Sequence, residues 1–375
     1  MNIRKRLIKV AEKILDEVVS NIEEKEMTSA IDVGTEEGMK KYIEQHPNYR
    51  EDTVFIVNGV ERKAPPKKEN NQSVGDEQKK LHEMAMSGDI NVILDVSKNK
   101  KTHKDTLAKL SDHKDIFVRA NVAKNLNTSP EILDKLSNDK NISVRSNVAK
   151  NKNTRLTTLH KLSDDKNKEV RREVARNPNT SHITLDQSSN DEDIATRVLI
   201  AVHSNTRTRT LRRLSDDKNE RVRGGVAENP NTITEILDKL SDDKYESVRR
   251  KVANNPNTIP EILDKLSDDK SENVRLHVAR NLNTSPEILD KLSNDKNEWV
   301  RGGVADNFFT SLETLDKLSN DKDESVRRKV ANNFNTSPEI LDKLSDDKDS
   351  LVKYWVISNH NTSPETLKKL RNLSL

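Results

Sequence analysis

Short apolar runs recur along the chain at a fixed spacing, from about residue 81 to the C-terminus. The string VRSNVAKN at residues 144–151 returns in altered form every 26 residues, with one double step of 52 whose middle keeps the register as TRVLIAVH. Clear copies begin at Val118, Val144, Val170, Val222, Val248, Val274, Val300, Val326 and Val352. A repeat without insertions predicts a solenoid of about eleven units, each packed on its two neighbours.

One unit, residues 248–273, shows what each repeat builds. Val248 and Val252 stand four residues apart, which predicts a short helix with one apolar stripe that ends at Asn255. Thr258 and Glu261 have the spacing of a capping box at the start of a second helix. The apolar face of that helix consists of Ile262, Leu263 and Leu266. The fold class is therefore all-α, a two-helix repeat in which about six apolar side chains per unit suffice because neighbours cover both flanks.

The pattern V-R-x-x-V-A-x-N-P-x-T-x-x-x-L-x-x-L-x-x-D resembles the variant leucine-rich repeat family, which is related to HEAT-type α-solenoids. The resemblance covers roughly residues 81–375. It implies a right-handed superhelix of alternating α and 3₁₀ helices, so the second helix of each unit is either α or partly 3₁₀. Some members carry a cysteine-bound iron–sulfur centre, but this chain has no cysteine. The family has no common catalytic activity.

Arginine follows the first position of the motif in nine consecutive units, and an aspartate precedes most of these arginines by six residues. Such a row is either a phosphate-binding ladder or an internal Asp–Arg ladder. At about 100° per residue, Arg249 lies on the inward side of its helix, which favours the internal ladder. The ladder comprises Asp139, Arg145, Asp165, Arg171, Asp217, Arg223, Asp243, Arg249, Asp269, Arg275, Asp295, Arg301, Asp321 and Arg327.

The two positions after each ladder arginine point away from the core and vary between units. Gly224-Gly225 recurs as Gly302-Gly303, and Arg250-Lys251 recurs as Arg328-Lys329, both 78 residues later. The paired glycines let either a partner or a neighbouring helix approach closely. Aromatic residues of the later units are either protein-binding anchors or fillers between layers. The candidate partner-binding residues are Arg250, Lys251, Arg328, Lys329, Tyr245, Trp299, Phe308 and Phe309.

The repeat is irregular between residues 185 and 205. Ser188-Ser189 replaces Leu-Ser, Thr196 replaces valine, and His203 replaces asparagine. We expect a bend or weak point here, with a docking site as the alternative. No nucleophile or carboxylate stands at a spacing that would make His203 catalytic.

The first eighty residues have a different organisation. Apolar residues at helical spacing predict an amphipathic helix over residues 1–24, which could pack within the molecule or mediate self-association. A second helix opens at Thr35 and ends at Pro47, and residues 53–63 form a β-hairpin around Asn58-Gly59. The predicted divisions are an N-terminal helix-plus-hairpin module at 1–63, a flexible linker at 64–80 and the solenoid at 81–375.

Composition narrows the function classes. The 375 residues are 31% apolar and 34% charged, with a net charge of +3, too balanced to argue for a bulk polyanion partner. The absence of cysteine excludes disulfides, thiolate metal sites and cysteine nucleophiles. No apolar run approaches the roughly 20 residues that span a bilayer, so we expect a cytoplasmic protein without membrane association.

These features predict a non-enzymatic repeat scaffold for protein–protein interaction. No catalytic residues, metal ligands or cofactors are expected, because no P-loop, dinucleotide-binding turn or metal-ligand spacing occurs. The partner is expected to be another protein. The alternative is a nucleic-acid-binding solenoid that contacts phosphates through Arg172, Arg250, Lys251, Arg328 and Lys329.

Overall fold

The structure is a computed structural model that describes residues 31–45, 54–58, 60–63 and 71–372. The chain divides into two compact units, residues 1–79 and 80–375. The amphipathic helix predicted over residues 1–24 lies outside the described residues, so it stays a prediction.

The N-terminal unit contains a small sheet with one helix. Its elements are β1 (Ile31–Gly34), α2 (Glu36–Gln45), β2 (Val54–Val57) and β3 (Val60–Lys63). The predicted second helix and the hairpin are confirmed, since β2 and β3 pair antiparallel and Asn58 turns the chain with φ of 52°. The sequence did not predict β1, which pairs parallel with β2. Four residues are too few to show a strand pattern.

Two aromatic side chains hold this unit together. Phe55 and Val57 of β2 are buried, and the ring of Tyr42 on α2 meets Phe55 edge-on with 5.5 Å between centroids. Arg62 of β3 donates to Glu36 of α2 at 2.6 Å. Helix α2 therefore packs on the sheet through one aromatic pair and one exposed ion pair.

Helix α3 (Asn71–Ala85) occupies the C-terminal part of the segment predicted as a flexible linker. The linker prediction is thus wrong from Asn71 onward. Leu81 and Ala85, four residues apart, are buried in the core of the first repeats together with Ile93 and Val96. The packing of these side chains stabilises α3, a helix that the polar composition of the segment does not predict.

The second compact unit, which holds all the repeats, contains eleven helix pairs in the described residues. The first helices are α4 (Ile90–Lys98), α6 (Ile116–Lys124), α8 (Ile142–Lys150), α10 (Lys168–Arg176), α12 (Ile194–Val202), α14 (Glu220–Glu228), α16 (Glu246–Asn254), α18 (Glu272–Arg280), α20 (Glu298–Asp306), α22 (Glu324–Asn332) and α24 (Ser350–Ser358). The second helices are α5 (Lys104–Leu110), α7 (Pro130–Leu136), α9 (Leu156–Leu162), α11 (His182–Gln187), α13 (Thr208–Leu214), α15 (Thr234–Ser241), α17 (Pro260–Ser267), α19 (Pro286–Leu292), α21 (Leu312–Leu318), α23 (Pro338–Leu344) and α25 (Pro364–Asn372). The all-α solenoid prediction is confirmed.

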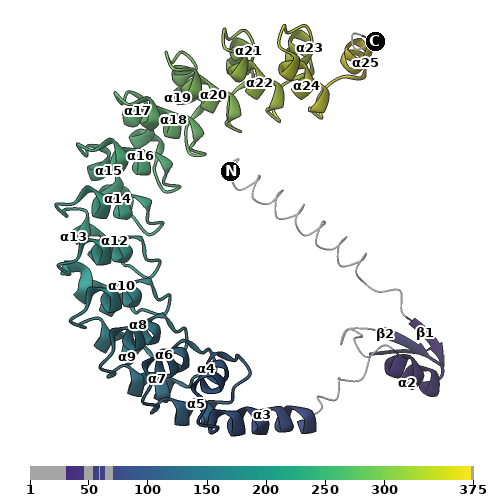
Figure 1. Ribbon diagram of the computed structural model, residues 1–375. Helices are drawn as coiled ribbons and strands as arrows, with labels where there is room; N and C mark the ends of the chain where they lie inside the picture. Colours follow the sequence, from purple (N-terminus) through teal and green to yellow (C-terminus); the bar gives the residue numbers. More distant parts are fainter. Residues whose placement is uncertain (1–30, 46–53, 59, 64–70, 373–375) are drawn as a thin grey trace. The chain divides into compact units, whose positions relative to one another are not determined.

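The repeats stack in a curved array. In Figure 1, first helices such as α14 and α16 follow the inner side of the curve, and second helices such as α15 and α17 follow the outer side. First helices of neighbouring repeats contact one another most extensively. The second helices are α-helical, and within the described ranges a 3₁₀ turn, η1 (Ser188–Asn190), occurs only after α11. Of the two alternatives left open by the sequence, the α-helical one therefore holds for the second helices of the regular repeats.

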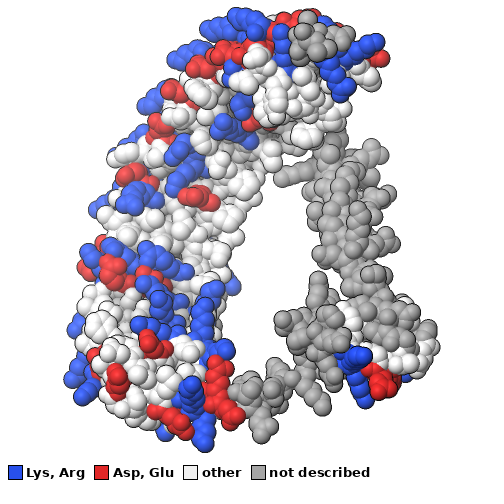
Figure 2. All heavy atoms as spheres, turned by 45° about the vertical axis from the view of Figure 1, so that its right-hand side comes forward, with Lys and Arg blue, Asp and Glu red and all other residues white. Residues whose placement is uncertain are grey.

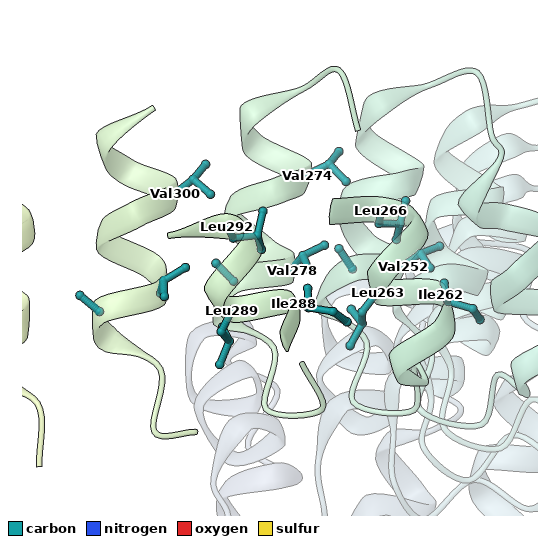
Figure 3. Close-up of a cluster of buried hydrophobic side chains, with 14 of the residues drawn as sticks. Val252, Ile262, Leu263, Leu266, Val274, Val278, Ile288, Leu289, Leu292 and Val300 are labelled. Carbon is teal, nitrogen blue, oxygen red and sulfur yellow. The ribbon is translucent and has the colours of Figure 1, made fainter. Parts of the chain in front are cut away.

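The core lies between successive layers. Figure 3 shows Val274 and Val278 of α18 pointing into the same space as Leu263 and Leu266 of α17 and Ile288 of α19. These side chains are buried, and the pattern recurs in the regular repeats. The spacing of valine and leucine in the sequence thus directly reports the interlayer core.

The threonine of the motif does not cap the second helix. Thr258 Oγ1 donates to the Val252 carbonyl at 2.6 Å, and Ile259, the N-cap residue of α17, makes no side-chain cap bond. The predicted capping box is wrong because the buried carbonyl at the end of α16 takes the hydroxyl. The threonine therefore joins the two helices of one repeat.

Candidate binding surfaces

The arginine row forms an internal ladder. In each of nine repeats the Nε of the arginine donates to an aspartate 20 residues downstream, at 2.5 to 2.7 Å, and Nη2 donates to the other oxygen. The pairs are Arg119–Asp139, Arg145–Asp165, Arg171–Asp191, Arg197–Asp217, Arg223–Asp243, Arg249–Asp269, Arg275–Asp295, Arg301–Asp321 and Arg327–Asp347.

Arg249 shows how one rung is built. The Arg249 side chain lies between the loop that contains Asp243 and the loop that contains Asp269, and only 6% of the residue is exposed. Nη1 donates to the carbonyl of Asp243 at 2.7 Å, while the carboxylate partner is Asp269 in the next turn. The aspartate six residues before the arginine therefore accepts through its backbone carbonyl. The carboxylate that pairs with the arginine belongs to the aspartate of the following layer. Both charges are satisfied inside the stack, so the ladder offers no phosphate-binding surface.

Seven of the nine ladder aspartates have a pKa below its ordinary value. Burial by itself raises the pKa of Asp269, but hydrogen bonds from Arg249 and the Ser271 N–H outweigh it, so the pKa lies below its ordinary value. The same balance lowers the pKa of Asp139, Asp165, Asp217, Asp243, Asp295 and Asp347.

Two rows of asparagine tie the loops of neighbouring repeats. Asn255 donates through its carboxamide to the Ala227 carbonyl at 2.7 Å and to the Asn229 carbonyl at 3.2 Å. Two residues on, Asn257 donates to the Pro230 carbonyl of the preceding loop. Equivalent bonds recur along the stack, so the asparagines are interlayer ties.

His203 takes the asparagine place in the irregular repeat. Its Nδ1 accepts from the Asn205 N–H at 3.0 Å, and Nε2 lies 3.0 Å from the Asn177 carbonyl. This network assigns the proton to Nε2, which then donates as the asparagine amide does. The ring is buried at 8% exposure and serves the stack.

The irregular repeat also divides the core. The buried side chains form two clusters, one ending at Val174 and the other including Ala175, Leu185 and Ile200. Ser188 stands where regular repeats have a leucine, and the chain there leaves the α-helix for the 3₁₀ turn η1. A missing apolar side chain weakens the contact between layers at this point.

The variable cations have different surroundings. Arg328 donates to both oxygens of Asp349 at 2.9 and 2.8 Å, and Lys329 lies 3.1 Å from Asp306. Lys251 pairs with Glu228 at 2.8 Å. Among the described residues, the exposed side chain of Arg250 has no hydrogen-bond or ion-pair partner.

Arg172, the remaining candidate phosphate contact, also pairs with acidic side chains. It donates to both oxygens of Asp193 at 2.8 Å and to Glu169 at 2.7 Å. Among the five candidate phosphate contacts, only Arg250 therefore lacks a carboxylate partner within the described residues.

The paired glycines serve the neighbouring helices. A Cβ on Gly225 would lie 2.9 Å from the Cβ of Ala201, and one on Gly303 would lie 3.0 Å from Leu276 Cδ1. At Gly224 and Gly302 the nearest atoms are the Cδ atoms of Lys251 and Lys329, at 3.3 and 3.2 Å. The second glycine admits the preceding helix, and the first provides space for a lysine stem of the following helix.

The aromatic candidates are exposed. Trp299 at the start of α20 is 60% exposed, and the rings of Phe308 and Phe309, in the loop after α20, meet edge-on at 5.4 Å. Phe334, one repeat later, is 68% exposed and its ring lies 5.0 Å from that of His360. Tyr245 is exposed beside Lys244, whose Nζ lies 5.0 Å from the ring centroid.

Phe309 interrupts the second asparagine row, a feature that sequence comparison between repeats could have found. Regular repeats have asparagine there, as at Asn283 and Asn335, whose amides bond the preceding loop. A phenyl ring has no hydrogen-bond donor, so Phe309 does not make the bond to the preceding loop that asparagine makes in the regular repeats. It adds an exposed aromatic side chain instead.

Charges of both signs are interspersed on the repeats. Figure 2 shows blue and red side chains side by side, with broad uncharged areas between them. Within the described ranges, His, Asp and Glu residues form no group of three that could hold a metal ion. No helix in those ranges has the length and apolar content needed to cross a membrane.

Comparison with known proteins gives matches in fold. No family model matches the chain, and no curated protein matches it. Among solved structures, a leucine-rich repeat variant with a novel repetitive structural motif is 23% identical, with a TM-score of 0.46 over 59% of this chain and 87% of that one.

Two further solved structures match more weakly. An engineered protein is 15% identical, with a TM-score of 0.30 over 79% of this chain and 99% of its own. The YibA protein of Escherichia coli is 16% identical, with a TM-score of 0.25 over 74% of this chain and 95% of its own. The assignment of the fold rests on the eleven helix pairs themselves.

Proposed function

We propose that the solenoid formed by the repeats is a non-enzymatic scaffold that binds another protein through the exposed aromatic residues of its later repeats. The observation that carries this proposal is the exposure of Trp299, Phe308, Phe309 and Phe334. Some other repeats have serine, proline or asparagine at these positions, as at Ser247, Pro256 and Asn257, and form the same helix pairs, so the rings are not required for the stack. Exposed aromatic side chains are typical anchors of protein interfaces.

The ladders support this choice by elimination. Their arginines and asparagines are engaged inside the stack and are not free for a partner. What remains for recognition is the set of variable positions, and among these the aromatic residues offer the largest contact area per side chain.

Nucleic-acid binding is less well supported. Arg172, Lys251, Arg328 and Lys329 each pair with a carboxylate, so phosphate contacts would first have to break those pairs. Counterion release, which drives phosphate binding, requires free positive charge. Cytoplasmic location and self-association through residues 1–24 stay predictions.

The test uses substitutions copied from other repeats. F308P/F309N gives this loop the residues of Pro256 and Asn257, and W299S copies Ser247, so the fold is expected to be retained. L126P is the matched control, because Leu126 is an exposed residue at the same loop position near the other end of the stack. Circular dichroism and thermal melts check the fold of each variant.

Affinity capture with the full chain then compares the four proteins. We expect one defined protein to be retained by the wild type and by L126P, and to be lost with F308P/F309N and W299S. Retention of that protein by all variants, or nuclease-sensitive retention of nucleic acid alone, would contradict the proposal.

A further inference from the structure

An open hollow lies in the irregular part of the stack, between the loops and first turns of the second helices α9, α11 and α13. Its volume is about 900 Å³. Figure 1 places α9 and α13 on the outer side of the curve, away from the exposed face of the first helices. The residues used below are Ser181, His182, Arg207, Thr208 and Arg209, which all line it.

The hollow contains cations and no acids. None of its lining residues is Asp or Glu. Within the described residues, the side chains of Arg207 and Arg209 have no hydrogen-bond or ion-pair partner. One turn further along α13, Arg212 pairs with Glu235 and Arg213 pairs with Asp186. Among the arginines at residues 207–213, those without a hydrogen-bond or ion-pair partner in the described part of the chain are thus the two that line the hollow.

Asp186, an acidic side chain of α11, is already engaged. Asp186 accepts from Thr210 Oγ1 at 2.6 Å and from Arg213 Nη2 at 2.9 Å. Thr210 and Arg213 both belong to α13, and their bonds to Asp186 connect it to α11. The carboxylate is thus engaged in a contact between layers. The charge of Arg209 helps to lower the pKa of Asp186, but neither Arg207 nor Arg209 makes a hydrogen bond to it.

The repeats around the hollow depart from the common pattern. Eight second helices have an acidic residue in the first turn, where it interacts favourably with the helix dipole. They are α5, α7, α15, α17, α19, α21, α23 and α25. The three consecutive helices α9, α11 and α13 have none. At the position of Glu235 and Glu287, α13 has Arg209, so the charge is reversed at a cost to the helix.

We propose that this hollow is a binding site for a phosphate monoester. Two unpaired guanidinium groups can each donate two parallel hydrogen bonds to phosphate oxygens. The Thr208 hydroxyl and the His182 imidazole add donors around them, and the Ser181 hydroxyl, which accepts from the Thr184 N–H at 3.2 Å, lies beside them. The volume accepts either a free phosphate ester or a phosphorylated side chain of a polypeptide, and both present the same group.

The test is calorimetric titration of the full chain at low ionic strength. The probes are O-phosphoserine, serine, and a glycine-flanked peptide with one phosphoserine. The variant R207S/R209E copies Ser285 and Glu287 of a regular repeat, so its fold is expected to be retained. The control is R212Q, which removes one positive charge from the same helix outside the hollow, compared with a net change of three charges in R207S/R209E.

We expect O-phosphoserine to bind and serine not to bind. Affinity is expected to fall at least tenfold in R207S/R209E, as lost charge-assisted hydrogen bonds require, and less than twofold in R212Q. Tighter binding of the peptide than of the free ester supports the site with a polypeptide as its source, and equal affinities support it with a small molecule. Absence of binding by the wild type, or equal affinity in R207S/R209E, overturns the proposal. Neither result bears on the aromatic surface of the later repeats.

Discussion

Helices α16 and α22 have the same nine residues, ESVRRKVAN, and yet their surfaces differ. The ladder arginines Arg249 and Arg327 have equivalent partners, and so do the lysines beside them. Arg328, however, pairs with Asp349, whereas Arg250 has no partner among the described residues. The residue 21 positions after Arg250 is Ser271. The next layer, and not the helix itself, decides which cation stays free.

Acid is expected to have the largest effect, because it acts on the ladder in both regions at once. The pKa values of Asp269 and Asp347 lie below the ordinary 3.8, with burial opposed by the hydrogen bonds from Arg249 and Arg327. The unfolded chain therefore binds these protons at higher pH than the folded chain does. Stability is expected to be complete above about pH 5 and to be lost as the pH falls through and below 3.8.

Urea melts between pH 7 and pH 2 measure this loss. The α22 region has one additional group, since the hydrogen bond from Arg328 lowers the pKa of Asp349 to about 2. A stability that does not change across this range would contradict the ladder as described.

Removal of one ladder arginine is the next largest change. R249A and R327A each leave an aspartate buried without its partner, and we expect each to cost about 3 kcal/mol. The two costs should be equal, because the rungs are the same. R250A is the control and should cost less than about 0.5 kcal/mol. Urea denaturation measures all three, and a cost for R249A no larger than that for R250A would refute the assignment.

The glycine pairs that precede the two helices provide a subtler test. G225A would place a Cβ 2.9 Å from that of Ala201, and we expect a loss of about 1–3 kcal/mol. G303A should cost less, because its nearest atom is the terminal carbon of Leu276, which can rotate. G224A and G302A meet only lysine stems and should stabilise by up to about 1 kcal/mol, since alanine favours the helix. Thermal melts of the four variants should therefore show opposite signs within each pair.

The smallest expected effect comes from exchanging the residues that distinguish the two regions, Ser271 and Asp349. S271D provides Arg250 with the partner that Arg328 already has, and we expect a rise in the melting temperature of about 1 °C that salt abolishes. D349S frees Arg328 and retains a helix-capping hydroxyl, so it should have the reverse, salt-sensitive effect. Equal salt dependence in the wild type and both variants would show that these pairs do not form in solution.

The repeated features were predictable because each occurs in nearly every unit. The buried valines and leucines follow helical spacing, and the helical phase of Arg249 already placed it inside. The partner of each arginine was not predictable from proximity in the sequence, because the neighbouring layer brings residue 269 to residue 249. The role of His203 was hidden for the same reason, since its acceptor Asn177 lies one repeat earlier.

The sequence by itself determined the repeat length, the two-helix unit, the residues of the core and the positions open to variation, because these follow from periodicity along one chain. Only the tertiary structure decided which charges are neutralised, where a hollow without acids lies and which glycines admit a neighbouring helix. Those properties arise between layers, where residues about 20 to 28 positions apart meet. The physical reason is that stacking brings side chains of adjacent repeats within hydrogen-bonding distance of one another. The pattern of residues along a single repeat does not show which side chains of the next repeat will be that close.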